Sequence, residues 1–505
     1  MPPRPPVVST FLANALDPRR RVPLSRQLYD ELRAALGDGR LAAGTRLPST
    51  RDLAGVLGLS RNTVLAAYEQ LAAEGWVTGR VGAGTRVAAA PASVPQPVPR
   101  PAPAAVKGAR LSARGRMLAR TSVSASPMKG ADRAFRPGVP ALDHFPFDDW
   151  RRRVAAFWSR PRAEQLGYGE PGGLAPLREA IAAHARAARA VRCDASQVLV
   201  VSGSQQGLDL AARLLLDDGD PVWMEDPGYV GARAAFQASG GRVVPVPVDG
   251  EGLVVEAGVR LAPRARLAYV TPSHQYPAGV VLSRERRTAL LAWARRAVAW
   301  ILEDDYDSEY RHVGWPLESL QGLDGGERVI YVGTFSKTMF PGLRLGYVIA
   351  PRALAAAFGN ARALLDRQPP AAEQAALASF LEDGAYARHL RRMRTLYAAR
   401  RAALLDAVAR DVPAARLELR PAETGMHLLG LLPPGVDDRA VSARALAMGV
   451  EAPALSRYAL RRPRRGGLVL GYAGYDERAL RRGATMLARA LAGEDGSATT
   501  RKEPT

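Results

Sequence analysis

The stretch Gly333-Thr-Phe-Ser-Lys-Thr-Met-Phe-Pro-Gly-Leu-Arg-Leu-Gly346 places a lysine shortly after two hydroxyl side chains and before an arginine. It follows the apolar, β-branched run 328–333, which is typical of a buried strand. A lysine at the mouth of such a strand can form a Schiff base with an aldehyde, and Thr334, Ser336 and Arg344 are suited to hold a phosphate. A solvated loop lysine would have the same local pattern, so the role of this lysine depends on the rest of the chain.

Apolar β-type runs alternate with helical patterns through most of the chain. The expected strands are 198–202, 221–224, 266–271, 299–302 and 329–332, and the helical patterns between them begin at Ser204, near Gly228 and near Ser283. This alternation predicts an α/β domain built on a largely parallel sheet. Ligands of such sheets bind beyond the carboxyl ends of the strands, so the polar residues at those ends are expected to meet in one pocket.

Polar and aromatic residues directly follow three of these strands. Gly203-Ser-Gln-Gln206 lies between a strand and a helix start, where free backbone amides suit a phosphate. Asp226-Pro-Gly-Tyr229 places an aromatic ring at the next strand end, and Glu303-Asp-Asp-Tyr306 places carboxylates and a phenol at another. Each segment alone is also compatible with an ordinary helix cap or loop.

Together these groups match the chemical requirements of pyridoxal 5'-phosphate (PLP). That cofactor needs a lysine for the Schiff base and a carboxylate that keeps the pyridine nitrogen protonated. A phenol at the ring hydroxyl, an aromatic face on the ring and donors for the phosphate complete the set. The strand ends supply each of these groups, so a PLP site is expected at their edge of the sheet.

The N-terminal part of the chain carries short helical patterns joined by a glycine. Leucines at 24, 28, 32 and 36 predict a first helix with one apolar stripe. Ser49 and Ser60 are expected to cap the next two helices, with the turn at Gly58. The apolar residues expected on those two helices are Leu53, Val56, Leu57, Val64, Tyr68 and Leu71. With a two-stranded wing expected over 76–87, this order is typical of a winged helix-turn-helix, although an ordinary helical hairpin has a similar pattern.

Composition limits the classes to which the chain can belong. Its 505 residues exceed the size of one hydrophobic core, so two or more domains are expected. The net charge of +21 is dominated by arginine, which prefers planar anions such as phosphate and makes nucleic acid an expected partner. The single cysteine, Cys193, excludes an intrachain disulfide and a thiolate metal cluster, and no metal site is expected. Without an apolar signal core at the start or a run of about 20 apolar residues, we expect a cytoplasmic protein and no membrane span.

Three segments of the N-terminal part resemble the winged helix of the GntR family of bacterial repressors almost position for position. They are Leu47-Pro-Ser-Thr-Arg-Asp-Leu-Ala54, Leu59-Ser-Arg-Asn-Thr-Val64 and Leu71-Ala-Ala-Glu-Gly-Trp76. The resemblance implies binding to a double-stranded DNA operator. The residues that it implies approach DNA are Arg51, Arg61, Asn62, Thr63 and, at the wing tip, Gly82.

Four segments of the large region resemble fold-type I aminotransferases, and with the winged helix the chain resembles the MocR subfamily of GntR regulators. They are Ser202-Gly-Ser-Gln-Gln206, Thr271-Pro-Ser-His-Gln-Tyr-Pro277, Glu303-Asp-Asp-Tyr-Asp-Ser-Glu-Tyr-Arg311 and Gly333-Thr-Phe-Ser-Lys337. The resemblance implies an α/β fold-type I PLP domain that ends in a smaller α+β subdomain, from about residue 385 to residue 492.

The same resemblance assigns a role to each candidate residue. Lys337 would form the Schiff base, or aldimine, with PLP, and Asp304 would hold the pyridine nitrogen. Tyr306 would meet the ring hydroxyl and Tyr229 would stack on the ring. The implied phosphate ligands are Ser204, Gln205, Thr334, Ser336 and Arg344. Tyr168 would reach the cofactor of the neighbouring subunit, which implies a head-to-tail, domain-swapped homodimer.

The expected domain boundaries follow from these patterns. They are a flexible N-terminus (1–20), the winged helix-turn-helix domain (21–89), a proline- and alanine-rich, then basic linker (90–133), the PLP domain (134–492) and a disordered tail (493–505). Recurring prolines predict that the first part of the linker is a semi-rigid spacer. Its basic part is either a solvated tether or a contact to DNA phosphate.

Two positions depart from the aminotransferase pattern. Tyr276-Pro-Ala-Gly279 stands where the enzymes carry Asn-Pro-x-Gly, so the asparagine that tunes the ring hydroxyl is replaced. In the strand expected at 467–473, Val469 lies at or near the place of the arginine that binds a substrate carboxylate. Loss of that clamp would remove about 1.5–3 kcal/mol of binding. Either one of the nearby arginines reaches the pocket or all of them form a solvated basic loop; they are Arg461, Arg462, Arg464 and Arg465.

The leading hypothesis is a PLP-binding transcription regulator that senses PLP itself, an amine or an amino acid, with at most weak transaminase activity. One alternative is a working aminotransferase that carries a DNA-binding arm. Another is a constitutive DNA-binding dimer in which PLP is only structural. The effector, the operator and the sign of regulation are not given by the sequence.

Overall fold

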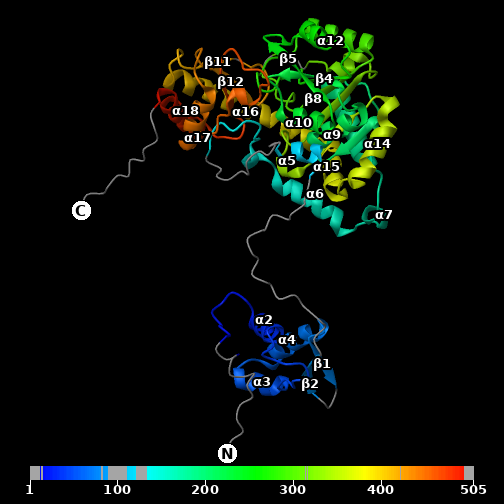
Figure 1. Cartoon of the computed structure of the whole chain (residues 1–505), viewed down its shortest axis with the longest axis vertical. Helices are drawn as coiled ribbons and strands as arrows, with labels where there is room; N and C mark the ends of the chain where they lie inside the picture. Colours follow the sequence, from blue (N-terminus) through cyan, green and yellow to red (C-terminus); the bar gives the residue numbers. More distant parts are fainter. Residues whose placement is uncertain are drawn as a thin grey trace, which may run out of the picture. The chain divides into compact units, whose positions relative to one another are not determined.

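The structure, a computed structural model, describes residues 12, 15–80, 84–88, 111–120, 133–312, 314, 317–420 and 422–493. The chain divides into two compact units, residues 1–110 and residues 111–505 (Figure 1). Across the described residues, no helix is long and apolar enough to cross a membrane.

The first unit is a winged helix. Its elements are α2 (Leu24–Gly37), α3 (Thr50–Leu57), α4 (Arg61–Ala73), β1 (Val77–Arg80) and β2 (Gly84–Val87). The two strands pair antiparallel with Val77 opposite Val87, which forms the wing. Gly82 lies outside the described residues.

Serine caps and a glycine turn shape the helix-turn-helix, as predicted. The Ser49 hydroxyl accepts the Asp52 amide at 3.1 Å, and the Ser60 hydroxyl accepts the Thr63 amide at 3.1 Å. Gly58 ends α3 with a φ of 66°, a left-handed conformation that costs glycine little.

The core of this unit joins all three helices. The fully buried leucines and valine on these helices are Leu28, Leu32, Leu53, Val64 and Leu71, and Leu12 before the helices is also fully buried. Val56 was expected on the apolar face of α3, but it is 54% exposed, because α3 is short and buries only Leu53 and Ala54.

The second unit is built on an eight-stranded sheet with the order β3-β10-β9-β8-β7-β4-β5-β6. Its strands are β3 (Val198–Val201), β4 (Pro221–Asp226), β5 (Arg242–Asp249), β6 (Gly252–Leu253), β7 (Leu267–Val270), β8 (Trp300–Asp305), β9 (Val329–Thr334) and β10 (Gly346–Ile349). The five predicted strands are confirmed as β3, β4, β7, β8 and β9. The sheet is mixed, because β10 runs antiparallel to both β3 and β9.

Helices cover both faces of this sheet. One face carries α9 (Ser204–Leu215), α10 (Val230–Ala238) and α14 (Arg352–Asp366), and the other carries α11 (Val255–Leu261), α12 (Arg284–Ala297) and α13 (Leu320–Asp324). In β4, Val222 and Met224 pack into the first layer and Trp223 into the second. Because both faces are buried, the strands are almost continuously apolar.

Strand direction gathers the site at one edge of the sheet. β4, β7, β8 and β9 are mutually parallel, and β3 shares their direction because β10 is antiparallel to both of its neighbours. The carboxyl ends of these five strands therefore meet at one edge. β10 begins at that edge, so Arg344, two residues before it, also arrives there.

A smaller subdomain follows along the chain, drawn in orange to red in Figure 1. Its antiparallel sheet has the order β11-β12-β13. The elements are α16 (Ala385–Asp411), β11 (Glu418–Arg420), β12 (His427–Leu431), α17 (Asp438–Ala447), β13 (Gly467–Gly471) and α18 (Glu477–Ala492). Leu404 of α16 and Leu487 of α18 are fully buried in the core that joins this subdomain to the larger one.

Along the described part of the second unit, four further helices precede the first strand of the large sheet, and one precedes α16. They are α5 (Ala113–Arg120), α6 (Phe147–Ser159), α7 (Ala163–Leu166), α8 (Ala175–Arg189) and α15 (Ala371–Glu382). Helix α5 falls within the expected linker, and its Arg114 donates to Asp218 at 2.9 Å on the second unit. The proline-rich part of the linker and the tail beyond residue 493 lie outside the described residues.

Candidate functional site

A cavity of about 300 Å³ lies at the edge where the strand ends meet, at the lower end of the size range of small-molecule sites. Its lining includes Gly138, Ser204, Gln205, Tyr229, Tyr269, Thr271, Tyr276, Asp304, Tyr306, Asp307, Thr334, Ser336, Lys337, Arg344, Met426 and His427. Nine of the ten residues proposed for the cofactor are thus in one cavity; the tenth, Tyr168, is not. The only lysine and arginine among the described lining residues are Lys337 and Arg344.

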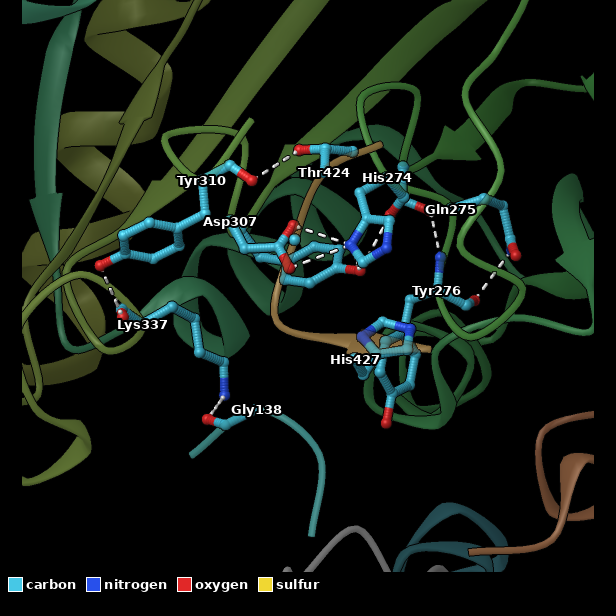
Figure 2. A network of polar contacts seen from close by, with 12 residues as sticks. Gly138, His274, Gln275, Tyr276, Asp307, Tyr310, Lys337, Thr424 and His427 are labelled. Carbon is cyan, nitrogen blue, oxygen red and sulfur yellow. Dashed lines mark hydrogen bonds and ion pairs between the residues drawn. The ribbon is translucent and has the colours of Figure 1, made fainter. Parts of the chain in front are cut away.

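Lys337 follows β9 and points its amine into the cavity. Its Nζ donates to the Gly138 carbonyl at 2.9 Å (Figure 2). Burial lowers the pKa of this amine, while Asp307 and Asp304 oppose the shift. A lowered pKa enlarges the neutral fraction, which is the form that attacks a carbonyl carbon.

Asp304 lies near the end of β8 with one oxygen bound and one free. Tyr269 donates its hydroxyl to Oδ2 at 2.8 Å, and Oδ1 is buried without a partner among the described residues. Burial, with a smaller contribution from Asp305, raises the pKa of Asp304 to about 7. An unpaired buried carboxylate oxygen is costly, and a protonated ring nitrogen is a donor that would satisfy it. The site therefore fits the pyridine ring of PLP at this position.

Two tyrosines border the space above Asp304. Tyr306 donates to the His274 carbonyl at 2.9 Å, and its hydroxyl is also 3.0 Å from His274 Nδ1. Tyr229, at the N-terminus of α10, lies with its hydroxyl 3.4 Å from Gln205 Oε1. A phenol and an aromatic face are thus available to the same ligand.

The cavity also gathers donors for an anion. Ser204 and Gln205 form the first turn of α9, whose backbone amides are free at a helix N-terminus. The Ser336 amide donates to Thr334 Oγ1 at 3.2 Å, which holds the two hydroxyls side by side. Arg344 is exposed and donates to the Ser202 carbonyl at 2.6 Å. This set fits a phosphate group.

Tyr276 lines the cavity and packs against an apolar and aromatic cluster behind it. Tyr276 donates to the Tyr458 hydroxyl at 3.1 Å. Val469 is fully buried in a cluster with Leu429, Leu455 and Tyr458. None of these residues is a cation that could bind a substrate carboxylate, and Arg457, which acts on Tyr276 and Tyr458 electrostatically, is not among the described residues that line the cavity.

The basic loop before β13 does not supply that cation. Arg461, Arg462 and Arg464 are exposed and do not line the cavity. Arg465 is bound to Glu418 at 2.8 Å. The sequence left open whether one of these arginines reaches the pocket or all of them form a solvated basic loop, and the structure shows the loop.

Tyr168 lies on the surface of the second unit. Its ring is 85% exposed, and the Arg367 guanidinium lies 4.9 Å from the ring centre. Trp158, Leu166 and Leu364 are further large apolar side chains that are more than half exposed. Within one chain Tyr168 is therefore not part of the cavity.

Sequence reasoning missed three buried side chains at the site. His274, Asp307 and His427 are each no more than 1% exposed, and atoms able to bind a shared ligand lie within 4.8 Å of one another. The first two stand inside segments that the sequence had singled out. His427 comes from the distant strand β12, and no local pattern connects it with the others.

Four of the five residues implied in DNA binding lie on α3 and α4 of the first unit. Arg51 on α3 and Arg61 and Asn62 at the start of α4 are exposed. The Thr63 hydroxyl is 2.8 Å from that of Ser60, so it takes part in the cap of α4. The structure brings these four residues to consecutive helices of the helix-turn-helix.

Residues 24–87 match the bacterial regulatory proteins of the gntR family, and residues 138–470 match aminotransferase class I and II. The chain belongs to the MocR subfamily of GntR transcription regulators. The two matches lie in the two compact units, so the DNA-binding and aminotransferase-like parts of this regulator are separate bodies.

Curated relatives match this regulator over nearly its whole length. The probable rhizopine catabolism regulatory protein MocR of Rhizobium meliloti is 42% identical over 94% of this chain and 95% of its own. The pyridoxine biosynthesis regulator PdxR of Corynebacterium glutamicum is 35% identical over 92% and 96%. The regulator TauR of Rhodobacter capsulatus is 35% identical over 96% and 99%.

Solved aminotransferases match the second unit of the regulator. LysN of Thermus thermophilus, an α-aminoadipate aminotransferase, superposes with a TM-score of 0.68 at 30% identity, over 75% of this chain and 97% of its own. The multiple substrate aminotransferase of Thermococcus profundus gives 0.68 at 29%, over 76% and 98%. Both comparisons identify the fold as that of fold-type I aminotransferases.

Proposed function

We propose that this regulator binds PLP covalently through Lys337 and that PLP, or an amine that reacts with it, changes how the winged helix binds operator DNA. The observation that carries the proposal is the free Oδ1 of Asp304, buried in the cavity that also holds the Lys337 amine. A carboxylate beside the ring nitrogen and an amine that reacts with the aldehyde are the two groups that make the ring an electron acceptor linked to the protein.

The proposed PLP contacts are distributed around that pair. Tyr306 meets the ring hydroxyl and Tyr229 stacks on the ring. The phosphate is held by Ser204, Gln205, Thr334, Ser336 and Arg344. The solved LysN structure contains a phosphopyridoxyl-leucine adduct, which is what a site of this fold holds in that enzyme. PLP bound in this way supplies an electron-withdrawing ring linked to the lysine.

The lining of the cavity favours a sensor over an efficient transaminase. A carboxylate clamp contributes about 1.5–3 kcal/mol, and the only arginine among the described lining residues, Arg344, is a proposed phosphate ligand. The ligand class best suited to this space is PLP itself or an amine without a carboxylate. Transaminase turnover of common amino acids is accordingly expected to be weak.

The regulator is further proposed to act as a head-to-tail homodimer. Tyr168, Trp158, Leu166 and Leu364 are large side chains of the second unit that are more than half exposed and that a second copy would cover. Tyr168 would then complete the partner's cofactor site. Arg51, Arg61, Asn62, Thr63 and Gly82 are the proposed DNA contacts.

The deciding experiment measures PLP binding and DNA binding on the same protein. Wild type mixed with PLP should develop a visible absorption band, and Lys337→Ala should not. Binding to the DNA upstream of the regulator's own gene is then compared with and without PLP. PLP should change affinity or footprint for wild type only, since a ligand shifts an equilibrium only by its differential affinity for the two states.

Pyridoxal without the phosphate is the matched control, because it can react with an amine but lacks the anion. Absence of the band would refute the PLP site. An unchanged footprint with the band present would support a purely structural cofactor. Rapid multiple turnover with amino acids would instead favour the working aminotransferase.

A further inference from the structure

A buried acid–base pair stands directly behind Tyr306. His274 Nδ1 lies 3.0 and 3.1 Å from the two carboxylate oxygens of Asp307, and 3.0 Å from the Tyr306 hydroxyl. Figure 2 shows the ring of His274 and the carboxylate of Asp307 facing each other across these contacts. The side chains of the pair are 0% and 1% exposed. The three residues form one continuous hydrogen-bonded line that ends at the cavity.

The hydrogen bonds select the tautomer of His274. Its Nε2 is buried and has no partner among the described residues, whereas Nδ1 has three oxygens in reach. An N–H without an acceptor is rarer in folded proteins than an unused acceptor. The proton therefore lies on Nδ1, where it is shared between Asp307 and Tyr306. Asp307 orients the ring, as a carboxylate behind a functional histidine does elsewhere.

Tight packing keeps this arrangement fixed. Gly425, with a φ of +88°, crosses the pair so closely that an added Cβ would lie 2.0 Å from His274 Cε1. On the cavity side the ring of His427 lies 4.5 Å from that of His274 between centres. His427 Nε2 is 3.2 Å from the Pro277 carbonyl and is thus engaged elsewhere.

We propose that the His274–Asp307 pair is a positioning relay that directs and strengthens the hydrogen bond from Tyr306 to the ring oxygen of bound PLP. This inference rests on the proposed function. With Nδ1–H donating toward the Tyr306 oxygen, the phenol becomes a stronger donor. Its proton, which the His274 carbonyl accepts in the ligand-free protein, then turns to the ring oxygen of the ligand. The relay takes the place of the asparagine that Tyr276 replaces, since the Tyr276 hydroxyl is committed to Tyr458.

The consequence is a shift in where the proton of the Lys337–PLP linkage resides. In its protonated form, the linkage nitrogen shares its proton with the neighbouring ring oxygen. A strong external donor to that oxygen competes with this internal hydrogen bond and favours loss of the proton. Removing the relay should therefore raise the pH at which the linkage titrates.

Other charged and titratable groups face the relay from the elements around it. They are Asp304, Asp305, Lys337, His427, Glu225, Tyr276, Tyr472, His312 and Glu309. Burial lowers the pKa of His274 to about 3; it also raises the pKa of Asp307, while His427 and Lys337 oppose that rise. His274 is thus neutral over the working pH range and acts by its hydrogen bond, not by its charge.

A cation shared by His274, Asp307 and His427 is the weaker explanation of the cluster. His274 Nδ1 and Asp307 already satisfy each other, and His427 Nε2 faces a carbonyl. The geometry is that of a hydrogen-bonded line.

The test follows the visible band of the PLP-loaded protein as a function of pH. His274→Leu removes the donor, Asp307→Asn removes the acceptor that orients it, and His274→Asn keeps an N–H near the place of Nδ1. His184→Gln, at a half-buried histidine of α8 that does not line the cavity, is the control. The midpoint should rise by about one pH unit or more for the first two variants, the size of one lost hydrogen bond to a charged group. It should stay near the wild-type value for His274→Asn and His184→Gln.

The outcomes distinguish the relay from a cation site and from a cavity that binds no PLP. Unchanged midpoints in both His274→Leu and Asp307→Asn would overturn the relay, as would a shift in His274→Asn equal to that in His274→Leu. Should His274→Leu bind no PLP, the Asp307→Asn midpoint decides. A wild-type midpoint that EDTA moves and Zn²⁺ restores would establish a cation site instead. Absence of any band in wild type would refute the proposed function and the relay together. A wild-type band whose midpoint the variants do not change would refute the relay alone.

Discussion

The Tyr269 hydroxyl donates to one oxygen of Asp304 at 2.8 Å and leaves the other oxygen without a partner. The two residues come from the adjacent parallel strands β7 and β8, so the sheet itself holds the carboxylate in place. Half of the carboxylate is thereby oriented by the protein, and the other half faces the cavity. This arrangement is favourable only when a donor fills the space.

Asp304→Asn should weaken PLP binding by about 10- to 100-fold, because an amide cannot keep the ring nitrogen protonated and a charge-assisted hydrogen bond contributes about 1.5–3 kcal/mol. Titration of the visible band with PLP measures the affinity. Asp209→Asn, on the outer part of α9 where Asp209 pairs with Arg213, is the control and should leave it unchanged. Equal affinities for Asp304→Asn and wild type would place the ring elsewhere.

The stability of the PLP-free protein should fall as pH rises toward 8. Burial raises the pKa of Asp304 to about 7, above about 3.9 for an unfolded aspartate, so the folded state binds this proton more tightly. The stability from such a group is complete below the unfolded pKa and is lost as pH rises through the folded one. Asp304→Asn cannot ionise and should escape this loss.

Thermal unfolding at pH 5 and pH 8 checks this sign. The melting temperature of Asp304→Asn minus that of wild type should be higher at pH 8 than at pH 5. The increase should be at least about 2–4 °C, which corresponds to about 1 kcal/mol. His274 and His427, whose pKa values are lowered to about 3, act in the opposite direction below about pH 6.5 in both proteins. Their effect cancels in the comparison. A difference that is constant with pH would contradict the prediction.

Periodicity and strand-end chemistry predicted most of the fold and the grouping of the site, for a physical reason. The buried strands are uninterrupted apolar runs, and parallel order forces their polar ends to one edge. β5 was missed because Arg242–Asp249 contains Pro245 and Pro247, which argue against a strand. It tolerates them because its only long partner is β4, while β6 pairs only with Val248 and Asp249 at its end.

The parts of the site that were missed depend on contacts between distant segments. His427 lies 153 positions after His274 (427 − 274), and only the docking of the small subdomain brings the rings to 4.5 Å. The Tyr276–Tyr458 contact is of the same kind. Such pairs leave no local pattern, because each residue is unremarkable within its own segment.

Arg61→Ala should weaken operator binding by about 10- to 100-fold and leave PLP binding unchanged, because a base contact by arginine contributes about 1–3 kcal/mol. The residue is exposed at the start of α4, in a different compact unit from the cavity. Arg26→Ala on α2 is the control, since Arg26 is bound to Asp30 at 3.1 Å. DNA titrations at two salt concentrations measure both affinity and salt slope. Loss of PLP binding in Arg61→Ala would show that the two units do not act independently.

Mixed dimers test whether Tyr168 completes the partner's site. Tyr168→Ala and Lys337→Ala homodimers should each bind PLP poorly. In a mixed dimer, one site carries both defects and the other carries neither, so half of the sites should recover wild-type affinity. Co-expression with two tags and titration of the visible band measures that fraction. Mixed dimers that bind no better than the Tyr168→Ala homodimer would place Tyr168 in its own subunit's function.

The PLP-loaded regulator should react with an amine about as well as with the matching α-amino acid. 3-Methylbutylamine and L-leucine differ only by the carboxylate, and Val469, at the expected place of the carboxylate-binding arginine, is buried with Leu429 and Leu455. Apparent affinities from band shifts should agree within about threefold, because no clamp adds its 1.5–3 kcal/mol (about 10- to 100-fold). An aminotransferase with the arginine in place should prefer leucine by that larger factor. A tenfold preference for leucine here would show that a cation reaches the ligand after all, and Arg344→Ala would then reveal whether the one other cation of the cavity supplies it.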